Sequence, residues 1–117
     1  MENLTLTIIE QKDVFDKALY FLNRLKSRNK VQNSDINEYI NQMINNKKDE
    51  TYDDDDICFI IIDINFKNEF QAKTASIFWN TVCEEAKGRN EELYEAAFQM
   101  YYGIIMALEE AKSEGEC

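Results

Sequence analysis

The spacing of apolar residues along the chain predicts two short strands and four helices. Near the N-terminus apolar residues alternate with threonines, a period of two that is typical of a β-strand over about residues 3–9. The alternating residues are Leu4, Thr5, Leu6, Thr7 and Ile8. From residue 12 the spacing becomes helical, and residues 12–28 and 34–46 each carry one apolar stripe. We therefore expect two amphipathic helices, the second of them capped by Ser34.

Residues 57–66 are rich in β-branched side chains and are the hardest segment to assign. The run Ile-Cys-Phe-Ile-Ile-Ile suits a buried strand, although it could also lie inside a helix. We expect a strand, because one face would be apolar throughout while the other turns polar at Asp63 and Asn65. Residues 47–56 are polar and charged, and we expect them to form a connection.

Two long helices are predicted over about residues 68–87 and 91–112. Gly88 suits the left-handed position that ends a helix and Asn90 suits the N-cap of the next, so the two helices should form an αα-hairpin. Their apolar faces are Phe70, Ile77, Phe78, Trp79 and Val82, and Leu93, Ala97, Phe98, Met100, Tyr101, Ile104, Ile105 and Leu108. The pattern as a whole predicts an α+β, helix-dominated fold in which residues 1–117 form a single domain.

The charge of the chain is strongly negative and unevenly distributed. The formal net charge is −10, with +2 over residues 1–48 (eight Lys/Arg, six Asp/Glu) and −12 over residues 49–117 (five Lys/Arg, seventeen Asp/Glu). Such a field repels nucleic acid and anionic lipid and attracts basic surfaces. We therefore expect a basic protein partner, with no direct nucleic-acid or membrane binding, although residues 12–30 form one locally basic segment.

The residue types present argue against an enzyme, a cofactor or a metal requirement. Histidine, the usual general acid or base and the commonest metal ligand, is absent. None of the three glycines opens a phosphate-binding loop. Cys58, Cys83 and Cys117 are too few and too far apart for a disulfide framework. The longest apolar run, residues 57–62, is shorter than the roughly 20 residues of a membrane span, so we expect a cytoplasmic protein, in its own cell or in an infected host.

Four consecutive aspartates, Asp53, Asp54, Asp55 and Asp56, are the most conspicuous local feature. They could form a solvated loop, a docking patch for a basic surface, or a divalent-metal site, although the glycine and distal glutamate of a calcium loop are missing. A nuclease-like set of Asp56, Asp63 and Lys67 can also be drawn.

Binding to a basic partner should combine acidic side chains with an exposed aromatic anchor. The aromatic residues of the last two helices are expected to be chiefly core, but Trp79 and Tyr102 lie away from the central stripes of their helices and are candidate anchors. The candidate acidic contacts are Asp53, Asp54, Asp55, Asp56, Glu84, Glu85, Glu91, Glu92 and Glu95. Gly103 should mark close approach to another helix, or to a second subunit in a homodimer.

These observations favour a non-enzymatic inhibitor or adaptor that covers a basic, nucleic-acid-binding surface of a partner such as a nuclease. In general composition the chain is similar to phage-encoded counter-defence proteins, including anti-CRISPR and anti-restriction inhibitors; the similarity covers no motif. Full mimicry of duplex DNA along the last helix, about 33 Å long, would need on the order of twenty carboxylates. That helix offers Glu91, Glu92, Glu95, Glu109 and Glu110, so ordinary blocking of an interface is the simpler hypothesis.

Two alternatives remain open. An immunity protein or antitoxin that neutralises a basic toxin would use the same interface physics. A helical oligomer that sequesters a small nucleotide ligand would instead show a defined pocket lined by tyrosine or arginine.

Overall fold

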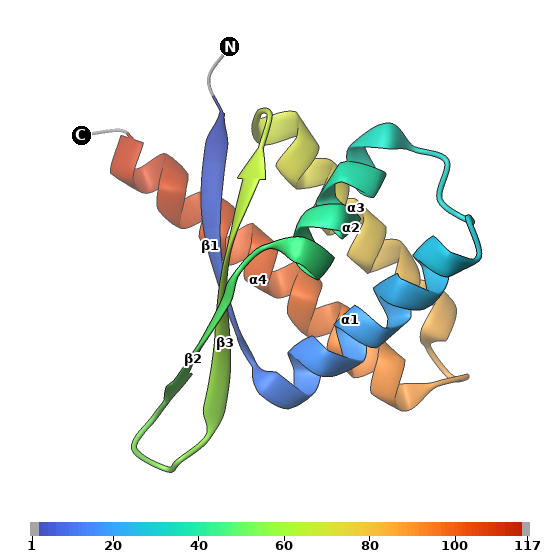
Figure 1. The fold of residues 1–117 in the computed structure, drawn as a ribbon, viewed down its shortest axis with the longest axis horizontal. Helices are drawn as coiled ribbons and strands as arrows, with labels where there is room; N and C mark the ends of the chain where they lie inside the picture. The colour runs from blue at the N-terminus through green and yellow to red at the C-terminus, as the bar shows by residue number, and fades with distance from the viewer. Residues whose placement is uncertain (1–2, 116–117) are drawn as a thin grey trace.

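The computed structural model describes residues 3–115, and its architecture confirms the predicted α+β, helix-dominated fold (Figure 1). Over these residues the chain forms four helices and one three-stranded sheet. In chain order the elements are β1 (Leu4–Gln11), α1 (Lys12–Ser27), α2 (Ser34–Asn45), β2 (Lys48–Tyr52), β3 (Cys58–Phe66), α3 (Glu69–Ala86) and α4 (Glu91–Gly115). The two predicted strands and all four predicted helices are therefore confirmed, with small shifts of their ends.

The expected connection over residues 47–56 is partly wrong, because it contains strand β2. The sheet has the order β1-β3-β2, and both outer strands are antiparallel to β3. The backbone of β3 thus has a partner on each side along residues 59–62. Strand β2 has the sequence Lys-Asp-Glu-Thr-Tyr, which lacks apolar alternation, and it forms because its backbone pairs with a strongly β-prone neighbour.

Side chains at the end of α2 and at its C-cap take the place of a second strand beside the part of β3 that β2 does not reach. Gln42 Oε1 accepts from the Asn65 amide at 2.7 Å, and Gln42 Nε2 donates to the Asn65 carbonyl at 2.8 Å. Asn46 Nδ2 donates to the carbonyl of Asp63 at 2.9 Å. The free edge of β3 is thereby satisfied without a further strand.

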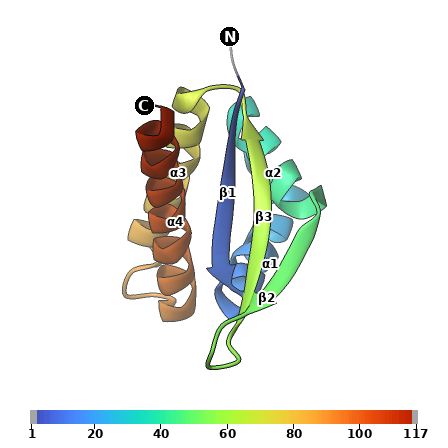
Figure 2. The ribbon, with the colours of Figure 1, turned by 90° about the vertical axis from the view of Figure 1, so that its left-hand side faces the viewer.

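Alternate side chains of β1 and β3 divide the sheet into a buried face and an exposed one. Leu6 and Ile8 are buried opposite Ile64 and Ile62, whereas Thr7 is exposed and donates from Oγ1 to Asp63 Oδ1 at 2.7 Å. In Figure 2 the strands lie between the α3–α4 pair and the α1–α2 pair. Helix α4 runs beside β1, and α2 contacts β3.

The turn between α3 and α4 has the predicted chemistry. Gly88 has a φ of 78°, and Asn90 Oδ1 accepts from the Leu93 amide at 3.1 Å as an N-cap. The cap of α2 is one residue earlier than expected: Asn33 Oδ1 accepts from the Ile36 amide at 3.0 Å, and Ser34 begins the helix.

The predicted inner face of α3 is wrong at two positions, because Phe70 and Ile77 are 71% and 61% exposed. Helix α3 packs instead through small residues that allow close approach to its neighbours. Its buried side chains are Gln71, Ala72, Ala75, Ser76, Trp79, Val82, Cys83 and Ala86. On α4, Phe98 is also exposed although it was expected in the core.

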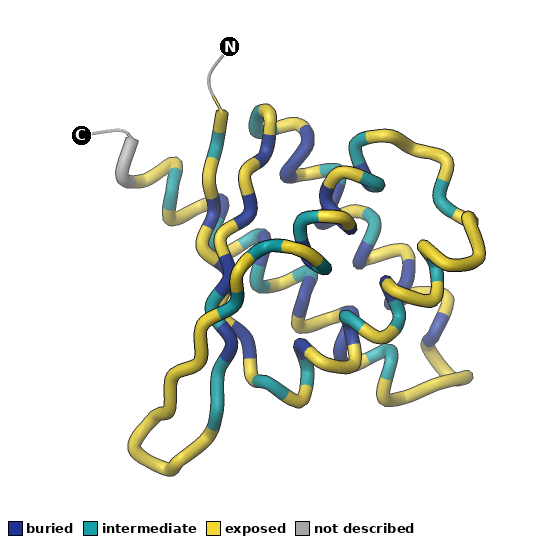
Figure 3. The backbone as a smooth tube through the Cα atoms, viewed as in Figure 1, coloured by how far each residue is buried: buried dark blue, intermediate teal, exposed yellow. Residues whose placement is uncertain are grey.

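The hairpin of β2 and β3 extends away from this core, as the exposed backbone in Figure 3 shows. Every residue from 49 to 57 is exposed. Among the helices that the structure describes, none combines the length and the apolar character needed to cross a membrane.

Candidate functional site

The acidic hairpin, defined as β2, β3 and the turn that joins them, brings the four consecutive aspartates to a projecting tip (Figure 1). Two backbone hydrogen bonds close the turn: Asp53 N to Ile57 O at 3.1 Å and Asp56 N to Asp53 O at 3.0 Å. Asp53 Oδ1 also accepts from the amides of Asp55 and Ile57, each at 2.9 Å. Asp56 has a φ of 63°, a left-handed conformation that aspartate tolerates better than most residues. The carboxylate of Asp53 therefore orders the tip.

The carboxylates of the hairpin are largely uncompensated. Six of the eight residues from 49 to 56 are acidic, and within residues 3–115 only Asp49 has an ion-pair partner, Lys47 at 3.6 Å. Four of these carboxylates, those of Asp53 to Asp56, are gathered in one closed turn. The hairpin and its tip thus concentrate negative charge in one short exposed segment.

Apolar side chains accompany these charges. Tyr52, the last residue of β2, is 61% exposed, and Ile57 is exposed directly after the tip. A partner could therefore bury an aromatic ring beside the carboxylates, which is the arrangement found at the centre of many interfaces. Neither residue had been predicted as an anchor.

The remaining predicted acidic residues lie on a second surface. Glu84 and Glu85 end α3, and Glu91, Glu92 and Glu95 begin α4; all five are exposed. Figure 1 shows the α3–α4 turn on the opposite side of the molecule from the acidic tip. Glu92 lies 3.8 Å from Lys17 Nζ, and acidic residues in the first turn of α4 also stabilise that helix. The structure therefore does not gather the predicted contacts into one site.

The prediction of Trp79 as an exposed anchor is wrong, because its side chain is completely buried. Its indole Nε1 donates to Tyr39 Oη at 2.8 Å, and its ring contacts Phe78 with centroids 5.1 Å apart. The indole lies on the same narrow stripe of α3 as the small buried residues, so it fills the space that they leave against the other helices.

Tyr102 is exposed as predicted, at 52%. Its ring lies parallel to that of Phe98, with centroids 6.3 Å apart, and Met106 follows one turn later, also exposed. Within the described chain Gly103 approaches a strand and not another helix: a Cβ at this position would lie 3.6 Å from Glu10 Oε2. The close approach is between α4 and strand β1.

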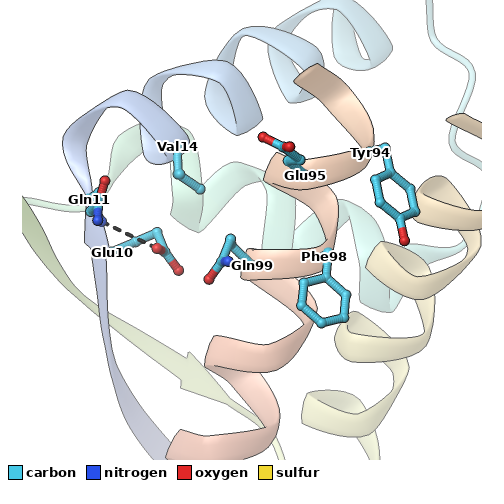
Figure 4. Close-up of a pocket in the computed structure, with 7 residues that line it drawn as sticks. All are labelled: Glu10, Gln11, Val14, Tyr94, Glu95, Phe98 and Gln99. Atoms are coloured by element: carbon cyan, nitrogen blue, oxygen red, sulfur yellow. Dashed lines mark hydrogen bonds between the residues drawn. The ribbon is translucent and has the colours of Figure 1, made fainter. Parts of the chain in front are cut away.

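A cleft between β1 and α4 contains a carboxylate that the sequence reasoning missed (Figure 4). The cleft has a volume of about 510 Å³ and is lined by Glu10, Gln11, Val14, Tyr94, Glu95, Phe98 and Gln99. Glu10 is only 9% exposed, and burial raises its pKa above the ordinary value. The signal was present in the sequence, because Glu10 continues the alternation of Leu6 and Ile8 on the inward face of the strand.

A second groove, of about 670 Å³, lies between α1 and the α3–α4 turn. Arg24, Arg28 and Lys30 line it and form no ion pair with the described residues, and the guanidinium carbon of Arg24 lies 5.7 Å from the centre of the exposed Tyr20 ring. Lys17, Phe21, Leu25, Leu93, Asp16, Glu85, Asn90 and Glu92 complete the lining.

The nuclease-like set is not assembled. Asp56 is at the hairpin tip and Asp63 is seven residues further along the chain, a separation of about 20 Å in a strand. Asp63 accepts from Thr7, and Lys67 pairs with Asp35 at 2.9 Å and with Glu38 at 3.6 Å. Across the described part of the chain, no three His, Cys, Asp or Glu side chains are placed to hold a metal ion.

The described cysteines occupy different environments. Cys83 is buried, and desolvation raises the pKa of its thiol, so the thiolate is disfavoured. Cys58 is half-buried at the start of β3. Cys117 lies outside the described residues.

Comparison with known proteins gave no match: no family, no curated protein and no solved structure resembles this chain closely enough to be counted as similar.

Proposed function

We propose that this protein is a non-enzymatic inhibitor that uses its acidic hairpin to cover a basic, nucleic-acid-binding surface of a partner protein. The observation that carries the proposal is the projecting segment of residues 49–57, which is exposed throughout and contains six carboxylates. A surface that has evolved to bind phosphates offers the complementary charge.

Order within the tip supports this role. The hydrogen bonds of Asp53 hold the turn before any partner arrives, so little conformational entropy is lost on binding. The uncompensated carboxylates of Glu50, Asp54, Asp55 and Asp56 would steer a basic partner and raise the association rate at low salt. Tyr52 would then supply apolar contact area.

An inhibitor of this kind would act in the cytoplasm, against a nuclease or another nucleic-acid-binding protein. Phage-encoded anti-CRISPR and anti-restriction inhibitors are the class that fits this chemistry. An immunity protein or antitoxin would use the same contacts against a basic toxin, and the identity of the partner would separate the two.

The proposal is tested by capture with matched variants. The hairpin variant carries Glu50→Gln, Asp54→Asn, Asp55→Asn and Asp56→Asn, and leaves Asp53 to hold the turn. The control variant removes the same number of charges elsewhere, with Glu84→Gln, Glu91→Gln, Glu109→Gln and Glu110→Gln. Each immobilised protein is exposed to lysate of a bacterial host, and the retained proteins are identified by mass spectrometry with and without added duplex DNA.

We expect the unmodified protein and the control variant to retain the same nucleic-acid-binding protein, and added duplex DNA to displace it. The hairpin variant should lose it. Equal retention by the hairpin and control variants, or retention that DNA does not disturb, would exclude the acidic hairpin as a blocker of a nucleic-acid surface.

A second candidate function, binding of a small nucleotide, is favoured by the groove beside Tyr20. It combines an exposed aromatic ring with Arg24, Arg28 and Lys30, which form no ion pair with the described residues, and such groups stack bases and bind phosphates. Millimolar nucleotides should raise the melting temperature of the protein but not of an Arg24→Gln/Arg28→Gln variant. Equal shifts for both proteins would remove this candidate.

A further inference from the structure

Glu10 is a buried carboxylate without a cation. Its Oε1 accepts a 3.3 Å hydrogen bond from the amide of Gln11, whereas none of the described residues donates to Oε2. No Lys or Arg side chain in the described chain lies within 4.0 Å of it. Among the described residues, no side-chain oxygen is both fully inaccessible to solvent and without a hydrogen-bond partner. Oε2 has no such partner, so it must be accessible to solvent, through the cleft in Figure 4.

This arrangement is costly for the fold. Burial disfavours the ionised carboxylate, and within the described residues the long hydrogen bond from the Gln11 amide offsets only part of that cost, because the pKa of Glu10 stays raised. The alternation of β1 would accept an apolar residue at position 10, as it does at Leu6 and Ile8. A titratable group that the fold keeps largely out of water, and that faces a cleft, is a candidate for binding a ligand.

The lining of the cleft selects a cation as that ligand. Glu95 adds a second carboxylate, and Gln99 adds an amide whose side chain extends toward Glu10 in Figure 4. Phe98 and Tyr94 add aromatic rings, which attract a cation. A flat cation that donates several hydrogen bonds suits a lining of carboxylate, amide and aromatic groups, and the guanidinium group of arginine has that form.

We propose that the cleft between β1 and α4 receives an arginine side chain of the partner protein, held by Glu10 with Glu95 and Gln99 against the Phe98 ring. The proposal rests on the proposed function, because it takes the partner to be basic. It adds a specific pocket to the diffuse attraction of the acidic hairpin, and bidentate contact of a guanidinium with a carboxylate gives the geometric selectivity that the hairpin lacks.

The test is an amide NMR titration of the whole protein with the peptide acetyl-Gly-Arg-Gly-amide. Peptides with lysine or the neutral isostere citrulline in the central position serve as ligand controls. Glu10→Gln tests the pocket, and Glu109→Gln, which neutralises an exposed acid further along α4, is the matched control. Free argininamide separates an arginine within a peptide from a small-molecule cation.

We expect the arginine peptide to shift the amides of Glu10, Gln11, Phe98 and Gln99, with at least tenfold weaker binding by Glu10→Gln and unchanged binding by Glu109→Gln. Citrulline should not bind. Equal affinity of Glu10→Gln and the unmodified protein, equal affinity for lysine, or tighter binding of free argininamide would overturn the assignment.

The hairpin variant described above separates this proposal from the proposed function. It should bind the arginine peptide as tightly as the unmodified protein does, because its substitutions lie outside the cleft. A negative titration combined with loss of partner capture by the hairpin variant would reject the pocket alone. A positive titration combined with unaffected partner capture would reject the hairpin mechanism alone.

Discussion

The indole nitrogen of Trp79 donates a 2.8 Å hydrogen bond to the phenolic oxygen of Tyr39, and both side chains are completely buried. Because water cannot replace either group, removing the acceptor leaves a buried N–H unsatisfied, at a cost of about 1–3 kcal/mol. We therefore expect Tyr39→Phe to lower the free energy of unfolding by that amount in urea titrations. Tyr102→Phe, which alters an exposed ring, should change it by less than about 0.5 kcal/mol. Equal stability of the two variants would contradict the role of this pair.

The stability of the protein should depend on pH through Glu10. Burial raises the pKa of this carboxyl above 4.5 in the folded protein, so the folded state binds more protons than the unfolded state in that range. The free energy of unfolding must then fall as pH rises through the folded pKa. Glu10→Gln removes this dependence. The substitution leaves in place the charged side chains of the adjoining elements, Glu95 on α4 and Lys12 at the start of α1.

Urea unfolding at several values between pH 4 and pH 7 measures the effect. The stability of Glu10→Gln relative to the unmodified protein should increase as pH rises through the folded pKa of Glu10 and then level off, because only the unmodified protein must ionise a buried carboxyl. A relative stability that stays constant across this range would show that Glu10 is not destabilised by burial.

The order of the acidic tip should depend on Asp53 and not on its neighbours. Asp53→Ala removes the acceptor for the amides of Asp55 and Ile57, and those amides should exchange hydrogen several-fold faster. Asp53→Asn keeps an acceptor oxygen and should preserve their protection. Asp54→Ala, whose carboxylate accepts no hydrogen bond from the described residues, is the control. Faster exchange in Asp54→Ala than in Asp53→Ala would refute the assignment.

The parts of the fold that could be predicted from the sequence are those that a local pattern of residues determines. Alternation identified β1, the β-branched run identified β3, and the Gly88 and Asn90 turn placed the αα-hairpin. Strand β2 was missed because it begins with Lys, Asp and Glu, which are depleted in strands, and shows no apolar alternation. It exists through backbone pairing with β3, a tertiary effect that no local pattern records.

The faces of α3 show a second limit. The prediction followed the large residues Phe70 and Ile77, but the helix packs through a stripe that begins with Ala72 and Ala75 and includes Trp79. Small residues permit close approach and leave a weak hydrophobic signal. For the same reason Trp79 was taken for a surface anchor.

The candidate site was predictable only in part. The aspartates of the tip and their exposure follow from composition, whereas their projection from the body requires β2, which the sequence did not reveal. Glu10 could have been found from the alternation of β1. Its cleft could not, because α4 approaches β1 from more than 80 residues away along the chain.

The most direct test of the acidic hairpin is the rate at which the protein associates with its captured partner, measured by stopped flow as a function of salt. Glu50→Lys, Asp54→Lys and Asp55→Lys reverse charges on the hairpin, and Glu91→Lys, Glu109→Lys and Glu110→Lys reverse the same number on α4. At about 50 mM salt the hairpin variant should associate at least tenfold more slowly than the α4 variant. The two rates should converge near 1 M salt, where the screening length falls to about 3 Å. Equal rates for the two variants at low salt would contradict the claim that the hairpin is the element that recognises the partner.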